Sequence, residues 1–243
     1  MWKIIHKFGS PPWFFRFATK AVQWLLPLML IALVVGCVWG LLYAPPDFRQ
    51  GNSYRIIFIH VPAAVVALAG YYVMAFAGLV SLVWKIKMAD VAMRAVAPVG
   101  AALTFVALVT GAIWGKPTWG AWWVWDARIT SMLILLFLYL GVVALFEAYE
   151  NPEVAAKACA VLSLVGTVNI PIIYKSVDWW YSLHQPASIK FTGESAIDAS
   201  MLYPLLVNIG AFYLLFAVVV MMNMRATLLE THSNAAWLRE AVD

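Results

Sequence analysis

The sequence predicts an all-α integral membrane protein with six transmembrane helices. The 243 residues are 64% hydrophobic and only 12% charged, whereas soluble globular domains are about half apolar and about a quarter charged. The apolar residues fall into six runs of 21 to 29 residues, and roughly 20 residues cross about 30 Å of hydrocarbon; the second run is long for one crossing. Because these runs take most of the chain, we expect one membrane domain over 1–243 and no large soluble domain.

The six runs are bounded by charged residues and by helix-breaking residues. A basic and aromatic segment leads into the first run, which is too long for the apolar region of a cleavable signal peptide. The sequence APPD at 44–47 ends this run. Pro62, near the start of the second run, predicts either a helix that begins there or a kink. The predicted spans are 21–43, 56–84, 91–114, 129–149, 154–174 and 200–224.

The positive charges predict the orientation. Six spans put both termini on one side of the membrane, and ten of the sixteen Lys and Arg residues lie on that side. The positive-inside rule therefore places both termini in the cytoplasm. The net charge of +4 is read as topology and not as a signal for nucleic-acid binding. A Trp-rich loop at 114–128 and a polar loop at 175–199 then both face outward.

The cysteines exclude two classes of redox protein. Cys37 and Cys159 are the only cysteines, and the chain has neither a CxxC nor a CxxCH motif. It is therefore neither a thiol–disulfide carrier of the usual type nor itself a c-type cytochrome. The two cysteines are predicted at different depths in the membrane, too far apart for a disulfide. We expect both to be packing residues.

The Trp-rich stretch WGKPTWGAWWVWD, from 114 to 126, holds five of the thirteen tryptophans. An aromatic belt spreads its tryptophans over many spans, whereas this stretch concentrates them in one loop, which favours a binding surface. On a helical wheel starting at residue 119, four of the five fall within an arc of about 160°. This predicts a short interfacial helix with one aromatic face. The five are Trp114, Trp119, Trp122, Trp123 and Trp125.

Two histidines are predicted beside this surface. His60 lies near the outer end of span two, and His184 lies in the outward 175–199 loop. An ionisable residue inside a span is by default a functional hypothesis. Haem fits such a pair, because its iron takes two axial ligands and its flat apolar faces pack on indole rings. We therefore predict that His60 and His184 ligate haem iron.

Three charged residues complete the predicted site. Arg55 and Arg128 are on the outer side and are candidates to bind the haem propionates. A topological or headgroup-anchoring charge explains Arg55 equally well, and pairing with Asp126 explains Arg128 equally well. Asp126 is expected to be structural, accepting hydrogen bonds from an indole, from a backbone N–H or from Arg128.

The stretch WGKPTWGAWWVWDARITS resembles the "WWD" signature of the haem-handling proteins. Within them the chain is similar to the cytochrome c maturation protein C (CcmC) family over its whole length, including the segments IHVPAA around His60 and WWYSLHQP around His184. The resemblance implies haem b held by these histidines at the periplasmic face of the bacterial inner membrane, on the WWD surface.

The resemblance also implies partners and a function. The protein would assemble with ATP-binding cassette subunits of the CcmA and CcmB type and with a small subunit of the CcmD type. It would pass haem to a periplasmic chaperone of the CcmE type, whose own histidine becomes bonded to a haem vinyl group. The chain would be a haem-binding and haem-transfer protein and not an enzyme, since it has no nucleotide-binding loop or other convincing catalytic set.

Two alternatives remain open at this stage. A membrane b-type cytochrome also uses histidine pairs, but usually within its spans and often with two haems. A permease for haem or another small molecule would carry polar residues at mid-membrane. The span interiors offer few such residues, which we expect to be helix-packing residues: Thr104, Thr110, Asn169 and Asn208.

Overall fold

The computed structural model describes residues 9–184 and 197–238, and the elements in these ranges are helices. Within the described residues, six helical segments are long and apolar enough to cross a membrane, which confirms the predicted fold class. The elements are α2 (Pro11–Val38), the π-helical turn η1 (Trp39–Tyr43), the 3₁₀ turn η2 (Asn52–Ile56), α3 (Ile57–Trp84), α4 (Lys87–Trp119), α5 (Ala127–Ala148), α6 (Pro152–Gly166), α7 (Asn169–Trp179) and α8 (Ala199–Thr231).

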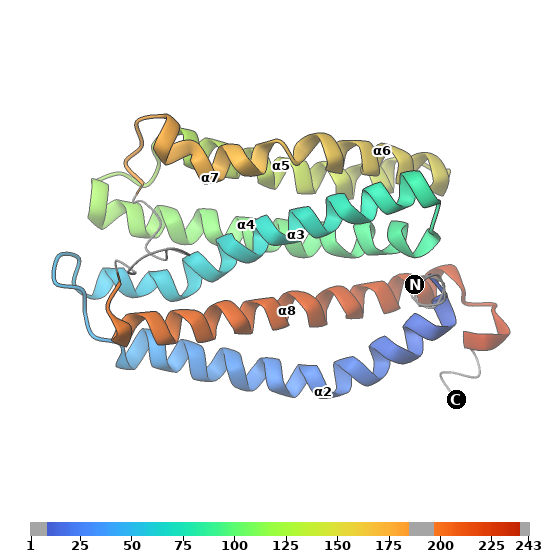
Figure 1. The fold of residues 1–243 in the computed structure, drawn as a ribbon, viewed down its shortest axis with the longest axis horizontal. Helices are drawn as coiled ribbons and strands as arrows, with labels where there is room; N and C mark the ends of the chain where they lie inside the picture. The colour runs from blue at the N-terminus through green and yellow to red at the C-terminus, as the bar shows by residue number, and fades with distance from the viewer. Residues whose placement is uncertain (1–8, 185–196, 239–243) are drawn as a thin grey trace.

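The helices form three layers (Figure 1). Helices α5, α6 and α7 lie on one side of the central pair α3 and α4, and α8 with α2 lies on the other side. Helix α2 packs mainly against α8, and much of its remaining surface is apolar and exposed, including Trp24 and Ile31. Helix α2 begins and α8 ends at the same end of the bundle, which we call the terminal end. The opposite end, with the Trp-rich segment, is called the site end.

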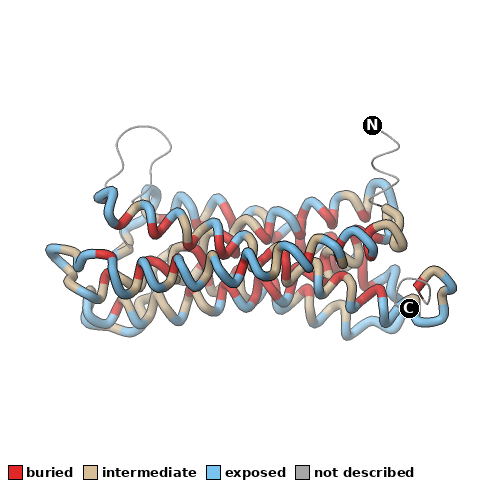
Figure 2. Tube along the Cα trace, turned by 90° about the horizontal axis from the view of Figure 1, so that it is seen from below, coloured by how far each residue is buried: buried red, intermediate tan, exposed pale blue. Residues whose placement is uncertain are grey.

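The core lies where the central pair meets the outer layers, and buried residues line the inner faces of the helices (Figure 2). Its largest fully buried side chains are Tyr71 and Tyr139. Tyr139 donates a hydrogen bond to the carbonyl of Ala67 at 2.7 Å. A Cβ at Gly100 would meet the Tyr139 ring at 2.1 Å, so only glycine admits this ring. Small residues allow such close approach between membrane helices.

Two of the polar residues inside the spans, Thr104 and Asn208, bond to backbone carbonyls within the bundle. The Asn208 side chain donates to the carbonyls of Gly36, at 2.8 Å, and Pro204, at 2.9 Å, and so joins α8 to α2. Thr104 donates to the carbonyl of Gly100 within α4. Cys159 is buried and Cys37 is partly buried, and both are free thiols.

The fifth span is not one helix. The run predicted at 154–174 comprises α6 and α7, with a break between Gly166 and Asn169. The Tyr71 hydroxyl fills the place that a Cβ at Gly166 would need. Asn169 donates to the carbonyl of Ser131 in α5 at 2.9 Å. As a result, α6 packs against both α3 and α5, whereas α7 packs mainly against α5.

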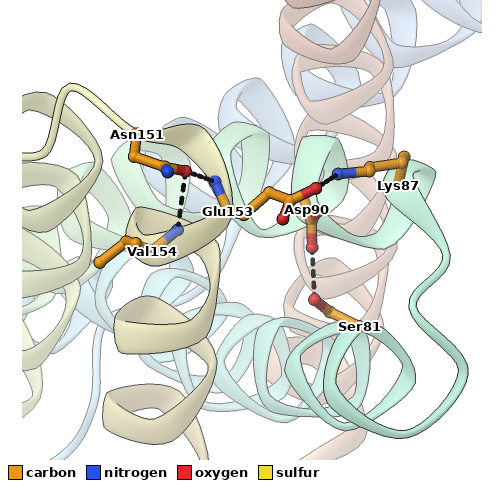
Figure 3. Close-up of polar contacts among 6 residues, drawn as sticks. All are labelled: Ser81, Lys87, Asp90, Asn151, Glu153 and Val154. Carbon is orange, nitrogen blue, oxygen red and sulfur yellow. Dashed lines mark hydrogen bonds and ion pairs between the residues drawn. The ribbon is translucent and has the colours of Figure 1, made fainter.

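At the terminal end, polar contacts join the α3–α4 turn to the start of α6 (Figure 3). Ser81 at the end of α3 donates to Asp90. Lys87 pairs with Glu153 at 2.7 Å. The Asn151 side chain caps α6 by accepting from the backbone N–H of Glu153. These contacts lie at the opposite end of the bundle from the Trp-rich segment.

Candidate functional site

The Trp-rich segment has two halves with different backbones. Helix α4 runs through its first half and ends at Trp119, because Gly120 takes a φ of +79° that glycine adopts without strain. Residues 120–126 are not helical, and α5 begins at Ala127. The expected interfacial helix over 119–126 is therefore wrong. The wheel assumed a continuous helix, and one glycine in the left-handed region ends it.

His60 is held against α4. Its Nδ1 lies 3.0 Å from the carbonyl oxygen of Ala107 and 3.2 Å from Oγ1 of Thr110. A carbonyl oxygen can only accept, so Nδ1 carries the proton and Nε2 carries the lone pair. The ring reaches this position beside Gly111, where a Cβ would meet Cε1 of His60 at 3.1 Å. Helix α3 runs without a break from Ile57 through Pro62, so His60 lies in its first turn.

His184 follows α7 and contacts α5. Nη1 of Arg128 donates to Nδ1 of His184 at 3.2 Å. The same guanidinium donates through Nε to Oγ of Ser176, at 3.3 Å, and through Nη2 to the carbonyl of Tyr174, at 3.1 Å. Arg128 therefore joins the start of α5 to the end of α7 and to the histidine that follows it. The rest of the predicted 175–199 loop, up to residue 196, lies outside the described residues.

The two predicted histidines meet at the site end. Their ring centroids are 6.3 Å apart, with an angle of 35° between the ring planes. Trp114 lies edge-on to His60 at 5.8 Å, and Trp119 lies 6.3 Å from His184. Two helices and a loop that are distant in sequence thus bring two imidazoles and two indoles together.

Trp114 is positioned by the connection between α2 and α3. Its Nε1 donates to Oε1 of Gln50 at 2.7 Å. Tyr54 packs edge-on to it at 5.7 Å. Because Trp114 in turn contacts His60, the loop before α3 supports the site through this indole.

The ring contacts of His60 and His184 described above involve Trp114 and Trp119, and the other three tryptophans have different surroundings. Trp122 is 58% exposed and Trp125 is 76% exposed. Trp123 packs edge-on to Trp125 at 5.4 Å. Its Nε1 is buried without a hydrogen-bond partner among the described residues. Most buried N–H groups in proteins have an acceptor, and this one has none among the described residues.

Asp126 accepts a hydrogen bond from a backbone N–H, one of the partners expected for it. Its side chain caps α5 by accepting from the backbone N–H of Ile129 at 2.8 Å. Its second oxygen accepts from Oγ of Ser182 at 2.6 Å. The same Ser182 oxygen accepts from the backbone N–H of His184 at 3.0 Å. Asp126 therefore fixes the segment that carries His184, while Arg128 contacts the histidine ring.

Arg55 braces the end of the first span. It donates to the carbonyl of Leu41 at 3.2 Å and to that of Ala44 at 2.6 Å. These are carbonyls at and just beyond the C-terminal end of η1, where a cation is favourable. Its Nε is buried without a partner among the described residues. The contacts give Arg55 a place in the fold at the α2–α3 junction.

Gln50, Ser176 and Ser182 were not predicted at this site, and Thr110 was predicted as a packing residue alone. Each forms a hydrogen bond to a predicted residue, across 2 to 64 positions of sequence, and Ser182 forms two, to Asp126 and to His184. Single polar residues in loops and helix ends are common, so no local pattern distinguishes these four. These partners become apparent only once the predicted residues have been placed in the folded structure.

The donor set limits what the site can hold. Among the described residues, no group of three or more His, Cys, Asp and Glu side chains could hold a metal ion. Two imidazoles alone leave most of the coordination positions of a metal empty. Within the described residues, a metal held between His60 and His184 would have only these two side chains of that kind as ligands.

Comparison with known proteins supports the resemblance. The family model described as "Heme exporter protein C" (CcmC) matches residues 4–239. The protein of that name from Escherichia coli (strain K12) is 46% identical over 242 residues, which cover 100% of this chain and 98% of the relative. The one from Haemophilus influenzae is 46% identical over 98% of this chain and 97% of the relative.

A more distant relative gives the same result. Heme exporter protein C from Paracoccus denitrificans is 39% identical over 237 residues, which cover 97% of this chain and 98% of the relative. With the family model matching nearly the whole chain, these similarities confirm the resemblance drawn from the WWD stretch and the histidine segments. The chain is therefore a multi-pass membrane protein that belongs to the CcmC family, that of heme exporter protein C.

Proposed function

We propose that this chain binds haem b between His60 and His184 at the periplasmic face of the bacterial inner membrane. It delivers this haem to a periplasmic chaperone of the CcmE type during c-type cytochrome maturation. It works in a complex with ABC transporter subunits of the CcmA and CcmB type and a CcmD-type small subunit. The name of its relatives, heme exporter protein C, supports haem as the cargo.

The observation that carries the proposal is the 6.3 Å separation of the two imidazole centroids. Two metal–nitrogen bonds of about 2 Å each, plus the distance from each nitrogen to its ring centre, span about 6 Å. In haem, the porphyrin already supplies four ligands to the iron, and the iron takes two more. A site with two imidazoles matches this need. The indoles of Trp114 and Trp119 supply apolar edges beside the rings.

Haem transfer needs an edge of the porphyrin that a partner can reach. Trp122 and Trp125 are exposed at the site end, and they lie in the non-helical part of the segment. We propose that this exposed part faces the chaperone while the histidines hold the iron. Positioning of this kind lowers the barrier to a bond formed between two bound partners.

The binding step is tested with purified full-length protein and three variants. His60→Ala and His184→Ala should each lose the optical signature of iron with two histidine ligands and most of the bound haem. His232→Ala is the matched control. His232 directly follows α8 at the terminal end, where it contacts Thr231, so it lies at the opposite end of the bundle from the site. Spectra that stay unchanged in both site variants would rule out the ligand assignment.

The delivery step needs a separate measurement. The chain is co-expressed with a CcmE-type chaperone, and covalent haem on the chaperone is measured by haem staining after denaturing electrophoresis. Deletion of the chain should abolish the adduct. A normal adduct level without the chain would contradict delivery, and reversible haem oxidation by a quinone without transfer would favour a b-type cytochrome.

A further inference from the structure

The two histidines have different hydrogen-bond partners on the same ring atom. Nδ1 of His60 faces the carbonyl oxygen of Ala107, which only accepts. Nδ1 of His184 faces Nη1 of Arg128, which only donates. An arginine side chain has no acceptor and keeps its proton in proteins. The ring protons of the two histidines must therefore be in different places.

For His60 the consequence is a ring ready to ligate. With the proton on Nδ1, the lone pair is on Nε2, and the carbonyl of Ala107 fixes the ring orientation. Ligating histidines in metal sites usually show this arrangement, with the second ring nitrogen donating to an oxygen. His60 needs no change of hydrogen bonding before its Nε2 binds iron.

For His184 the consequence is the opposite. Its Nδ1 accepts from Arg128, so the ring is neutral and its proton is on Nε2. A protonated nitrogen has no lone pair for iron. For Nε2 to ligate, Nε2 must give its proton to a water molecule and Nδ1 must take one from water, with no net change in charge. The protonated Nδ1 then faces the N–H of Arg128, so this hydrogen bond must break.

We propose that Arg128 is a positioning residue that holds His184 in a non-ligating state until haem is bound at His60. The inference rests on the proposed function, since it assumes that both histidines ligate iron. His60 binds the iron first, and His184 closes the second position when Arg128 releases it. The bonds of Arg128 to Ser176 and to the carbonyl of Tyr174 keep the guanidinium in place after release. The same exchange in reverse opens one face of the iron when haem leaves.

The first test uses the haem-free, full-length protein, and its outcome does not depend on haem binding. Ring-nitrogen NMR of ¹⁵N-histidine protein at alkaline pH, where imidazoles are neutral, distinguishes the two tautomers. We expect Nδ1–H for His60 and Nε2–H for His184, with each signal assigned by its loss in the alanine variant. A His184 with its proton on Nδ1 in the wild type would overturn the proposal.

Two substitutions of Arg128 separate positioning from a general structural role. Arg128→Lys keeps a side chain that only donates, so His184 should keep its proton on Nε2. Arg128→Gln offers an oxygen that can accept from Nδ1–H, so His184 should shift toward the Nδ1–H tautomer. If both variants give the wild-type tautomer, Arg128 does not control the ring and the proposal fails.

The second test uses haem-loaded protein and measures coordination per bound iron by resonance Raman spectroscopy. Arg128→Gln should raise the ratio of six- to five-coordinate iron by about tenfold, which corresponds to the loss of one charge-assisted hydrogen bond. A fall in this ratio would show that Arg128 promotes ligation by His184, against the proposal. If the His60→Ala and His184→Ala spectra match the wild type, the proposed ligand set fails instead.

Discussion

The Trp-rich segment has a helical half, up to Trp119, and a non-helical half, residues 120–126. Both halves carry tryptophans, but in different surroundings. Trp114 and Trp119 lie in the last turns of α4 and contact the histidine rings. Trp122 and Trp125 follow Gly120 and are exposed. The helix fixes the direction of the first two indoles, whereas the non-helical half leaves Trp122 and Trp125 exposed and Trp123 partly buried. The backbone thus divides the segment into a part that builds the site and a part open to a partner.

The largest effect is expected from Trp114→Ala. The change removes the edge contact with His60, the contact with Tyr54 and the hydrogen bond to Gln50. We expect a loss of about 3 kcal/mol in unfolding free energy and of most bound haem. Thermal unfolding in detergent and the pyridine haemochrome assay measure the two effects. Trp114→Phe keeps an aromatic ring, so its stability and haem content should lie between those of the wild type and Trp114→Ala. Full haem content in Trp114→Ala would contradict the distinction between the two halves of the segment.

A smaller effect is expected from Asp126→Ala at the end of the non-helical half. The variant loses the cap of α5, worth about 1 kcal/mol, and the bond to Ser182 that fixes the His184 segment. We expect ligation by His184 to weaken while ligation by His60 stays, which resonance Raman spectroscopy reports as more five-coordinate iron. Asp126→Asn keeps an acceptor oxygen and is the control. An unchanged spectrum in Asp126→Ala would show that Asp126 does not affect ligation by His184.

Gly111→Ala tests how closely His60 must approach α4. The new Cβ would lie 3.1 Å from Cε1 of His60, so the ring must shift by a few tenths of an ångström. We expect a stable protein that binds haem about five-fold more weakly, a loss of about 1 kcal/mol, measured by haem titration. Gly210→Ala in α8 is the matched control, because its Cβ meets no atom within 4 Å. Equal affinity in the two variants would show that the contact has no role.

The smallest effect is expected from Trp125→Ala. This side chain is 76% exposed, and surface substitutions usually change stability by no more than about 0.5 kcal/mol. Haem content and unfolding temperature should match the wild type, and Trp122→Ala should behave alike. If either variant lost as much haem as Trp114→Ala, the division of the segment into two parts would be wrong.

The sequence was enough to predict six long apolar helices and the proximity of His60 and His184, and the reasons are physical. Crossing a membrane requires long apolar helices, and topology then places His60 and His184 at one face. The break between α6 and α7 was not predictable from the apolar run. Nothing in that run indicates that the hydroxyl of Tyr71 in α3 lies against Gly166. The end of α4 at Gly120 was not predicted, because the helical wheel continued through Gly120, and glycine often ends a helix.

The break in the fifth span assigns the two proposed ligands to different packing units. His60 lies on α3 against α4, whereas His184 follows α7, which packs on α5. The eleven residues of α7 rise about 16 Å, so a tilt of about 4° at the break moves the end of α7 by about 1 Å. The distance between the two imidazoles therefore depends on the angle at this break. In the proposed function, that angle would set how far apart the two ligands of the iron lie.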